Sequence, residues 1–339
     1  MPACPASSSQ ARPFGFRKLL FFGLLPLLAL PARAQHTAAP RDTSFTAHSA
    51  YQKAKKQHPT ISIARPPVPR GVRAHTNLTY CTPGSRSLQL DVFQPKTKRR
   101  QQLPAVLLIH GGGWRSGDRS QHVPMAQQLA GRGFVAVTAE YRLSTEAAYP
   151  AAVQDLKAAI RWMRANASHY AIDTSRIAVW GFSAGGQLAA LVGSTNGNPL
   201  FEAGPCNRSF SSSAQAIVDV DGILAFIHPE SGEGNDSKST SAATYWFGSN
   251  KLTRPDLWQQ ASALTYAGAA TPPILFLNSG VDRMHAGRDD MMRQLTALGI
   301  YTEVHSFPEA PHPFPLFNPW FEPTLNYTVD FLHKVLPQR

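Results

Sequence analysis

One serine lies in a sequence typical of a catalytic nucleophile. Ser183 is the central residue of residues 181–185 (GFSAG), a G-x-S-x-G motif. The motif places its serine on a tight strand-to-helix turn, where a side chain at either glycine would collide across the turn. The flanking residues fit this context, because residues 177–180 have the pattern of a buried strand and residues 187–192 that of a helix. The sequence therefore predicts that Ser183 attacks a carbonyl carbon.

A second glycine-rich segment, residues 110–114 (HGGGW), follows an earlier apolar run. Consecutive glycines expose backbone N–H groups, the donors needed where a carbonyl oxygen becomes anionic. The alternative is a phosphate-binding loop, but no lysine or G-x-G-x-x-G spacing follows. We predict an oxyanion hole formed by the amides of Gly112, Gly113 and Ala184, with His110 shaping the loop rather than reacting.

A serine nucleophile also needs a base and an acid that orients it, and α/β folds that carry this motif present them in the chain order serine, acid, histidine. Asp282 follows the apolar run 274–277, and His312 follows the predicted strand 302–307. Side chains beyond the carboxyl ends of parallel strands meet at one edge of a sheet. The sequence therefore predicts a triad of Ser183, Asp282 and His312.

Other acids and histidines are rivals for these two roles. The rival acids follow an earlier predicted strand or lie within a predicted helix: Asp219, Asp221, Asp289 and Asp290. The rival histidines lie too near Asp282, inside a predicted strand or in the last predicted helix: His285, His305 and His333.

The elements that must position these residues alternate along the chain. The predicted strands are residues 88–93, 105–109, 134–141, 177–180, 217–220, 274–277 and 302–307. The predicted helices are residues 125–130, 151–165, 187–192, 288–298 and 324–336. Strands separated by helices predict an α/β fold with an open, mostly parallel sheet.

One connection is longer than the others. Residues 223–273 contain a polar stretch and then aromatic residues such as Trp246 and Trp258. Long connections often form lids or binding loops, so we expect a small lid-like insertion at the rim of the site. The alternative is a structural cover for the edge of the sheet.

The N-terminus has the pattern of an export signal. Basic residues precede the apolar run 19–30, and small residues at 32 and 34 predict cleavage of residues 1–34 before Gln35. The run is shorter than the ~20 residues that span a bilayer, so we expect a secreted or periplasmic protein without a stable membrane anchor. Residues 35–75 mix Lys, His and Pro without periodicity and predict a basic linker or an arm that lies along the surface, which leaves residues 76–339 as the catalytic domain.

The formal net charge of +12 lies mostly outside the predicted catalytic domain. Residues 35–75 carry a net +6, whereas the 264 residues after them carry 22 basic and 20 acidic side chains. A nucleic-acid-binding protein would carry its basic patch on the folded body, so that class is excluded. The basic segment fits either a solvated linker or a surface that attracts acidic polymers.

Export would leave two cysteines, Cys81 and Cys206. An oxidising compartment would allow a disulfide between them, but two separate thiols fit the sequence equally well. Neither cysteine has the spacing of a zinc site, and we expect no metal.

Several of these segments recur in the same order in α/β-hydrolase esterases. They are residues 110–114 (HGGGW), 140–143 (EYRL), 149–152 (YPAA), Asp155 and 181–186 (GFSAGG). Over residues 75–337 the chain resembles hormone-sensitive-lipase-like carboxylesterases and bifunctional feruloyl and acetyl xylan esterases. The resemblance implies an eight-stranded hydrolase sheet, no cofactor and the Ser183–Asp282–His312 triad.

The chain departs from the usual pattern of that family at two places. Phe182 precedes the nucleophile where the lipase-like branch usually has an acid, and residues 110–118 look more like the xylan-esterase branch. Proline on both sides of His312 replaces the usual Gly-His-x-Phe pattern, and the aromatic segment 315–320 forms either a wall of the cleft or packing at the sheet edge. The aromatic residues that we expect to bind substrate are Trp114, Phe182, Trp246 and Phe314.

The function implied is a secreted serine carboxylesterase that removes acetyl or feruloyl groups from plant cell-wall polysaccharide. Its partner would be an acylated polysaccharide or oligosaccharide; the sequence indicates no oligomeric state. The alternatives are a general short-chain carboxylesterase, a serine peptidase, an aryl formamidase and a non-catalytic binding module. A peptidase usually needs a larger cap, export argues against a formamidase, and a binding module typically lacks the nucleophile or base.

Overall fold

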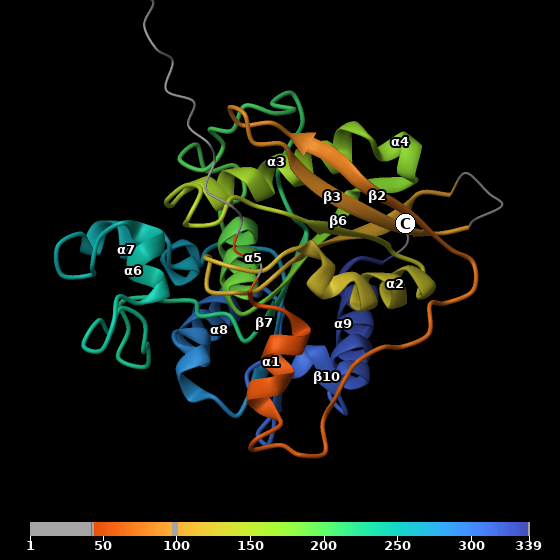
Figure 1. Cartoon of the computed structure of the whole chain (residues 1–339). Coiled ribbons are helices and arrows are strands. Elements are labelled where there is room, and N and C mark those ends of the chain that lie inside the picture. Colours follow the sequence, from red (N-terminus) through yellow and green to blue (C-terminus); the bar gives the residue numbers. More distant parts are fainter. Residues whose placement is uncertain (1–41, 43, 97–100, 338–339) are drawn as a thin grey trace, which may run out of the picture. The chain divides into compact units, whose positions relative to one another are not determined.

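A sheet of eight strands runs through the molecule (Figure 1). In spatial order its strands are β2 (Val72–Cys81), β3 (Leu88–Pro95), β5 (Val135–Ala139), β4 (Leu103–Ile109), β6 (Ile172–Phe182), β7 (Ala216–Val220), β8 (Ile274–Ser279) and β9 (Thr302–Phe307). The strands from β5 to β9 are parallel, whereas β3 is antiparallel to both β2 and β5. The predicted α/β architecture and mostly parallel eight-stranded sheet are confirmed.

These observations come from a computed structural model that describes residues 42, 44–96 and 101–337. The predicted signal segment, residues 1–34, lies outside the described residues. Within the described part of the chain, no helix combines the length and apolar character needed to cross a bilayer.

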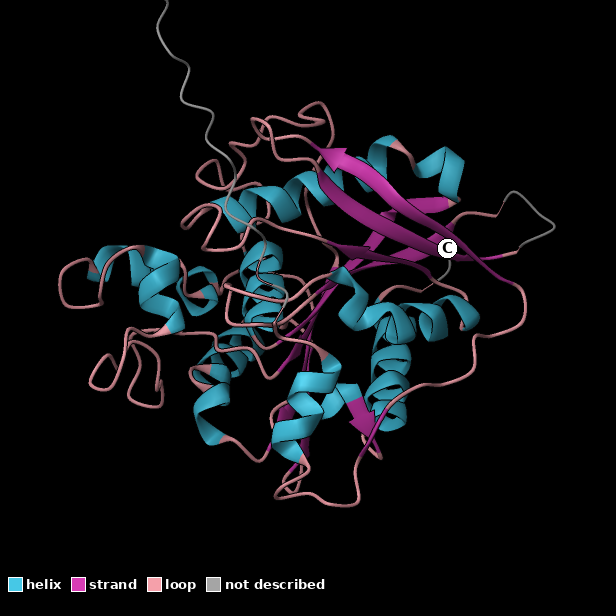
Figure 2. Ribbon diagram, in the orientation of Figure 1, coloured by secondary structure: helices cyan, strands magenta, loops and turns pink. Residues whose placement is uncertain are grey.

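Helices cover both faces of the sheet (Figure 2). One core contains residues from α3 (Ala151–Ala165), α5 (Ala184–Ser194) and α8 (Arg288–Ala297). The opposite core contains residues from α1 (Ala47–Ala54), α2 (Val123–Gly131) and α9 (Phe321–Val335). All seven residues of β4 are buried, and Leu107 and Leu108 face different cores. The continuous apolar sequence of this strand follows from burial on both sides.

Of the two alternatives for residues 35–75, the structure shows the surface arm rather than a free linker for the described part, residues 42 and 44–75. A capping box between Thr46 and Ser49 begins α1, and β1 (Ser62–Ile63) pairs with β10 (Phe317–Asn318). The apolar side chains of Ile61 and Ala64 are buried. Prolines and lysines hide the pattern because only a few scattered residues reach the core. The arm therefore packs on the body of the molecule, and β2 begins before the predicted boundary at residue 76.

The insertion at residues 223–273 carries two short helices, α6 (Ala242–Phe247) and α7 (Pro255–Gln260). Its two tryptophans pack inward, because Trp246 and Trp258 are fully buried among Phe226 and Phe247, whereas Tyr245 is exposed. The insertion therefore has its own apolar contacts with the core, in addition to residues at the site described below.

Cys81 and Cys206 form a disulfide, which answers the question that the sequence left open. The bridge joins the end of β2 to the loop after α5, across a sequence separation of 125 residues. In the chain-entropy account, a link across so long a loop restricts the unfolded chain strongly.

We expect the double variant Cys81→Ala/Cys206→Ala to lower the free energy of unfolding by about 2–4 kcal/mol. Urea unfolding of the oxidised protein and the variant measures this difference. Reduction by dithiothreitol should lower the urea midpoint of the natural protein toward that of the variant. The same treatment should leave the midpoint of the variant unchanged. Equal midpoints for oxidised protein and variant would contradict the prediction.

His122 is a buried histidine at the start of α2. Its ring lies edge-on against Trp180, with 4.8 Å between the ring centroids. Loss of hydration on burial, with a smaller effect of His110, lowers the pKa of His122 from 6.5 to about 3. The folded protein therefore holds this imidazole neutral at pH values where the unfolded chain protonates it.

The stabilisation linked to His122 should be present above pH 6.5 and lost as the pH falls toward 3. The reason is that only the unfolded chain takes up this proton in that interval, which costs about 1.4 kcal/mol per pH unit. His122→Phe keeps an aromatic ring against Trp180 and removes the titration. Between pH 6 and pH 4.5, urea unfolding should show a shallower decline of stability in the variant; parallel declines would refute the assignment.

Candidate active site

Ser183 lies on a strained turn between β6 and α5. Its backbone has φ 59° and ψ −123°, and its N–H donates to the carbonyl of Val220 at 2.8 Å. A Cβ atom on Gly181 would lie 1.9 Å from the carbonyl oxygen of Gly185, and one on Gly185 would lie 2.2 Å from that of Ile109. Both glycines of the motif are thus required by close backbone approach, and the turn presents the serine hydroxyl beyond the sheet.

His312 lies between Ser183 and an acid. Its Nε2 atom is 2.8 Å from Ser183 Oγ, and its Nδ1 atom is 2.9 Å from Oδ2 of Asp221. The ring of Phe182 packs beside the imidazole, with 5.0 Å between the centroids. These contacts form a serine–histidine–carboxylate chain, in which the acid can fix the imidazole tautomer and the histidine can accept the serine proton.

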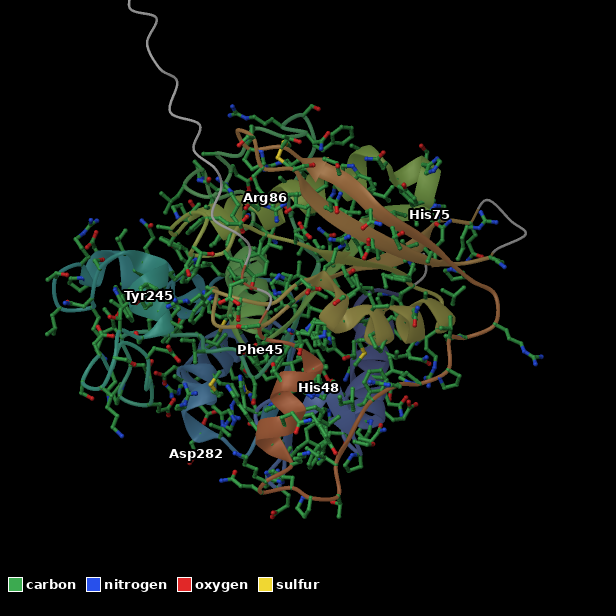
Figure 3. All side chains as sticks on the ribbon, viewed as in Figure 1. Phe45, His48, His75, Arg86, Tyr245 and Asp282 are labelled. Carbon is green, nitrogen blue, oxygen red and sulfur yellow. A yellow bond between two sulfur atoms is a disulfide. The ribbon has the colours of Figure 1, made fainter. Side chains whose placement is uncertain are left out.

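The acid in contact with His312 is Asp221, and the prediction of Asp282 is wrong. Asp221 is fully buried, and its Oδ1 accepts the N–H of Ser279 at 2.7 Å. Asp282 is exposed at the start of a short 3-10 turn after β8, and Figure 3 shows it at the edge of the molecule.

Strand register explains the difference. Phe182 of β6 pairs with Val220 of β7, so Ser183 and Asp221 are the next residues of adjacent strands. Asp282, by contrast, comes three residues after the end of β8, which lies one strand further from Ser183. Both acids satisfy the serine–acid–histidine order, and the signal that could have separated them is how directly the acid follows its strand.

Asp219 is a buried acid that supports the turn of Asp221. Its Oδ1 accepts the N–H of Gly222 at 2.8 Å. Burial raises the pKa of Asp219 well above its usual range, with the neighbouring Asp221 charge adding to the rise. Its hydrogen bond to the turn makes Asp219 a positioning residue for Asp221.

We expect Asp221→Asn to lower kcat/KM for 4-nitrophenyl acetate by about 10⁴-fold, because an amide disfavours the productive histidine tautomer and does not stabilise the imidazolium. Asp282→Asn is the matched control, and its rate should stay within about threefold of the natural protein because the side chain is exposed. Circular dichroism checks that both variants are folded. A larger loss in Asp282→Asn than in Asp221→Asn would overturn this assignment.

The glycine-rich loop is built around buried contacts. The N–H of Gly111 donates to Oε1 of Gln121 at 2.9 Å, and the indole N–H of Trp114 donates to Oε1 of Gln187 at 2.9 Å. His110 is buried and stacks on Tyr141 with 4.3 Å between centroids, as expected for a residue that shapes the loop. Gln187 thereby ties the loop to α5.

A cleft opens beside Ser183, and two of the three predicted oxyanion donors line it. Gly113 and Ala184 line it beside Ser183, whereas Gly112 is not among its lining residues. Gly112 and Gly113 have φ values of 125° and 61°, in the region that favours glycine. The three amides stay a prediction as oxyanion donors.

The cleft at Ser183 has a volume of about 170 Å³. Its lining residues are Gly113, Trp114, Ser183, Ala184, Ile223, Glu233, Ala242, Arg283, Met284 and His312. The apolar side chains can contact a small acyl group, and Glu233 and Arg283 add polar surface. Pockets for drug-sized ligands measure roughly 300–1,000 Å³, so this cleft suits a smaller group.

Of the four aromatic residues predicted to bind substrate, only Trp114 lines the cleft. Phe182, Trp246 and Phe314 are fully buried, and predicting them as substrate contacts was wrong. Phe182 packs against His312, Trp246 stacks on Trp114 at 4.9 Å, and Phe314 packs on Phe307 at 5.0 Å. Aromatic sequence alone does not distinguish a ligand wall from the layer behind it.

The segment after His312 is packing rather than cleft wall. Pro315, Leu316 and Phe317 are buried, and none of them lines the cleft at Ser183. The arm contacts this segment, because the N–H of Ala64 donates to the carbonyl of Leu316 at 2.9 Å. Among the described residues, no three His, Cys, Asp or Glu side chains gather as a metal site would require.

Comparison with known proteins identifies an esterase family. The profile of the family described as BD-FAE matches residues 90–286, more than half of the chain. The esterase LipQ of Mycobacterium tuberculosis is 26% identical over 72% of this chain and 58% of its own length. Across this and two other curated relatives, the chain spans about a third to three fifths of the relative's length.

Two solved structures share the fold. The protein titled bifunctional GH43-CE from Bacteroides eggerthii is 26% identical, with a TM-score of 0.65 over 77% of this chain and 38% of that one. The esterase Est2 of Thermogutta terrifontis, solved with butyrate bound, is 25% identical, with a TM-score of 0.64 over 82% of this chain and all of that one.

Proposed function

Because the chain belongs to the BD-FAE family of α/β-hydrolase esterases, we propose that it is a serine carboxylesterase that removes short acyl groups from carbohydrate. The observation that carries the proposal is the hydrogen-bonded chain from Ser183 Oγ through His312 to Asp221. Ser183 and His312 line a cleft whose volume suits a small ester. An intact nucleophile and base also argue against a non-catalytic binding module.

The reaction follows from the positions of these groups. His312 accepts the Ser183 proton through Nε2 while Oγ attacks the ester carbonyl carbon, and Asp221 stabilises the resulting imidazolium. The backbone amides around Gly113 and Ala184 stabilise the oxyanion, where one donor is worth on the order of 2.7–4 kcal/mol of barrier. The alcohol leaves with the proton from His312, and water then repeats these steps to release the acid.

The size of the cleft favours acetyl over feruloyl as the acyl group. A feruloyl group carries an aromatic ring and a propenoyl chain, whereas the cleft of about 170 Å³ is smaller than the pockets that enclose drug-sized ligands. Est2, a similar protein, holds the four-carbon acid butyrate. We therefore place acetyl first among the substrates.

The alcohol half is proposed to be a plant cell-wall polysaccharide or an oligosaccharide from it. Residues 110–118 resemble the xylan-esterase branch, and the similar protein of Bacteroides eggerthii is titled a bifunctional GH43-CE. We also propose that the protein is exported to the periplasm or the medium. The signal pattern of residues 1–34 supports this, and so does a disulfide, which persists in oxidising compartments.

Hydrolysis of a panel of esters tests the proposal. We expect kcat/KM to be highest for 4-nitrophenyl acetate and butyrate and much lower for the octanoate and methyl ferulate, because the longer acyl groups exceed the cleft. Acetylated xylan should release acetate. Ser183→Ala should reduce each rate by about 10⁴-fold or more, since the nucleophile is lost.

Each outcome decides between the alternatives. A preference for octanoate or ferulate would contradict the short-acyl assignment, and activity restricted to small esters would indicate a general carboxylesterase. Turnover of an N-formyl aryl amide in preference to the esters would indicate a formamidase. The esterase proposal fails if no substrate shows turnover that depends on Ser183.

A further inference from the structure

An ion pair lies in the wall of the active-site cleft. Glu233 and Arg283 both line the cleft beside Ser183, and Nη1 of Arg283 is 3.0 Å from Oε1 of Glu233. Among the described residues that line the cleft, the titratable side chains are His312, Glu233 and Arg283. We propose that this pair is a subsite that binds hydroxyl groups of the sugar leaving group. The inference rests on the proposed esterase function and specifies which alcohols the enzyme prefers.

The two partners come from different loops that meet at the cleft. Glu233 lies in the insertion, and Arg283 lies in the short turn that follows β8. The backbone carbonyl of Glu233 accepts a hydrogen bond from the ammonium group of Lys251 at 3.0 Å. Beside Arg283, the neighbouring Met284 is buried and also lines the cleft. The backbone on both sides is therefore anchored beside the cleft by contacts that leave the two charged groups available.

The pair retains unused hydrogen-bonding capacity. The Arg283 side chain is 51% exposed, and a guanidinium has five N–H donors, of which Glu233 takes one. Within the described part of the chain, no hydrogen bond engages Oε2 of Glu233. The subsite thus offers charged donors next to a charged acceptor at the surface of the cleft.

This combination matches a neutral polyol better than other alcohols. Each sugar hydroxyl both donates and accepts, so it can donate to the carboxylate and accept from the guanidinium. Hydrogen bonds to charged groups are about twice as strong as neutral ones. A nitrophenyl or ethyl leaving group offers no hydroxyl donor. An arginine alone would favour an anionic sugar, but the adjacent carboxylate offsets its charge.

The test compares two acetyl esters that differ in the alcohol. We expect Glu233→Gln and Arg283→Met to lower the ratio of kcat/KM for acetylated xylo-oligosaccharide to kcat/KM for 4-nitrophenyl acetate by about 10- to 100-fold. That range is the loss expected for one or two charge-assisted hydrogen bonds made only to the sugar. The natural protein and each variant are assayed in the same buffer at the same salt concentration.

Arg254→Met is the matched control. Arg254 pairs with Asp256 at 2.7 Å in the same insertion, with both side chains more than half exposed, and neither residue lines the cleft. This variant should leave both rates and their ratio unchanged. An unchanged ratio in Glu233→Gln and Arg283→Met, with both substrates slowed alike, would overturn the subsite and leave the esterase proposal intact. Failure of the esterase proposal is distinct, because the natural protein would then show no Ser183-dependent turnover of either ester.

Discussion

The imidazole of His312 is the group on which the site depends, because it must contact two residues held by two other strands. Ser183 directly follows β6 and Asp221 directly follows β7. The pairing of Phe182 with Val220 brings them to the same level of the sheet. His312 comes from the loop after β9, two strands beyond β7. A parallel sheet meets this requirement because its strands all deliver their carboxyl ends to one edge.

Much of the surrounding structure fixes that imidazole. Phe182, directly before the nucleophile, packs against the ring, so the residue that distinguishes this chain from lipase-like relatives serves as support for the base. The backbone after His312 is held by β10, which pairs with β1 of the N-terminal arm. The arm, whose sequence fits either a linker or a surface arm, is thus part of the frame of the loop that carries His312. Its few buried side chains are sufficient because strand pairing satisfies the backbone polar groups.

The sequence predicted the parts of the site that depend on local constraints. The motif around Ser183 requires glycines by close backbone contact, and continuous apolar runs such as that of β4 require burial on both faces. The structure also places His312, which follows the last strand of the sheet, in contact with Ser183. Asp221 was missed because chain order does not specify strand register, and two acids after neighbouring strands satisfy the same rule. Trp246 and Phe314 were misplaced for a related reason, since burial of an aromatic ring depends on packing between distant segments.

The proposed triad and the proposed sugar subsite lie in different parts of this fold. The triad belongs to turns at the ends of β6, β7 and β9, where a small displacement would separate proton donor from acceptor. Ile223, Glu233 and Ala242 of the cleft belong to the insertion, which has its own packing through Trp246 on Trp114. The indole of Trp114 is tied to α5 through Gln187, so the contact surface of the insertion is fixed to the helix that begins at the nucleophile. If the proposed subsite binds the sugar, sequence changes in the loop that carries Glu233 would alter which alcohols bind while the Ser183–His312–Asp221 geometry stays as it is.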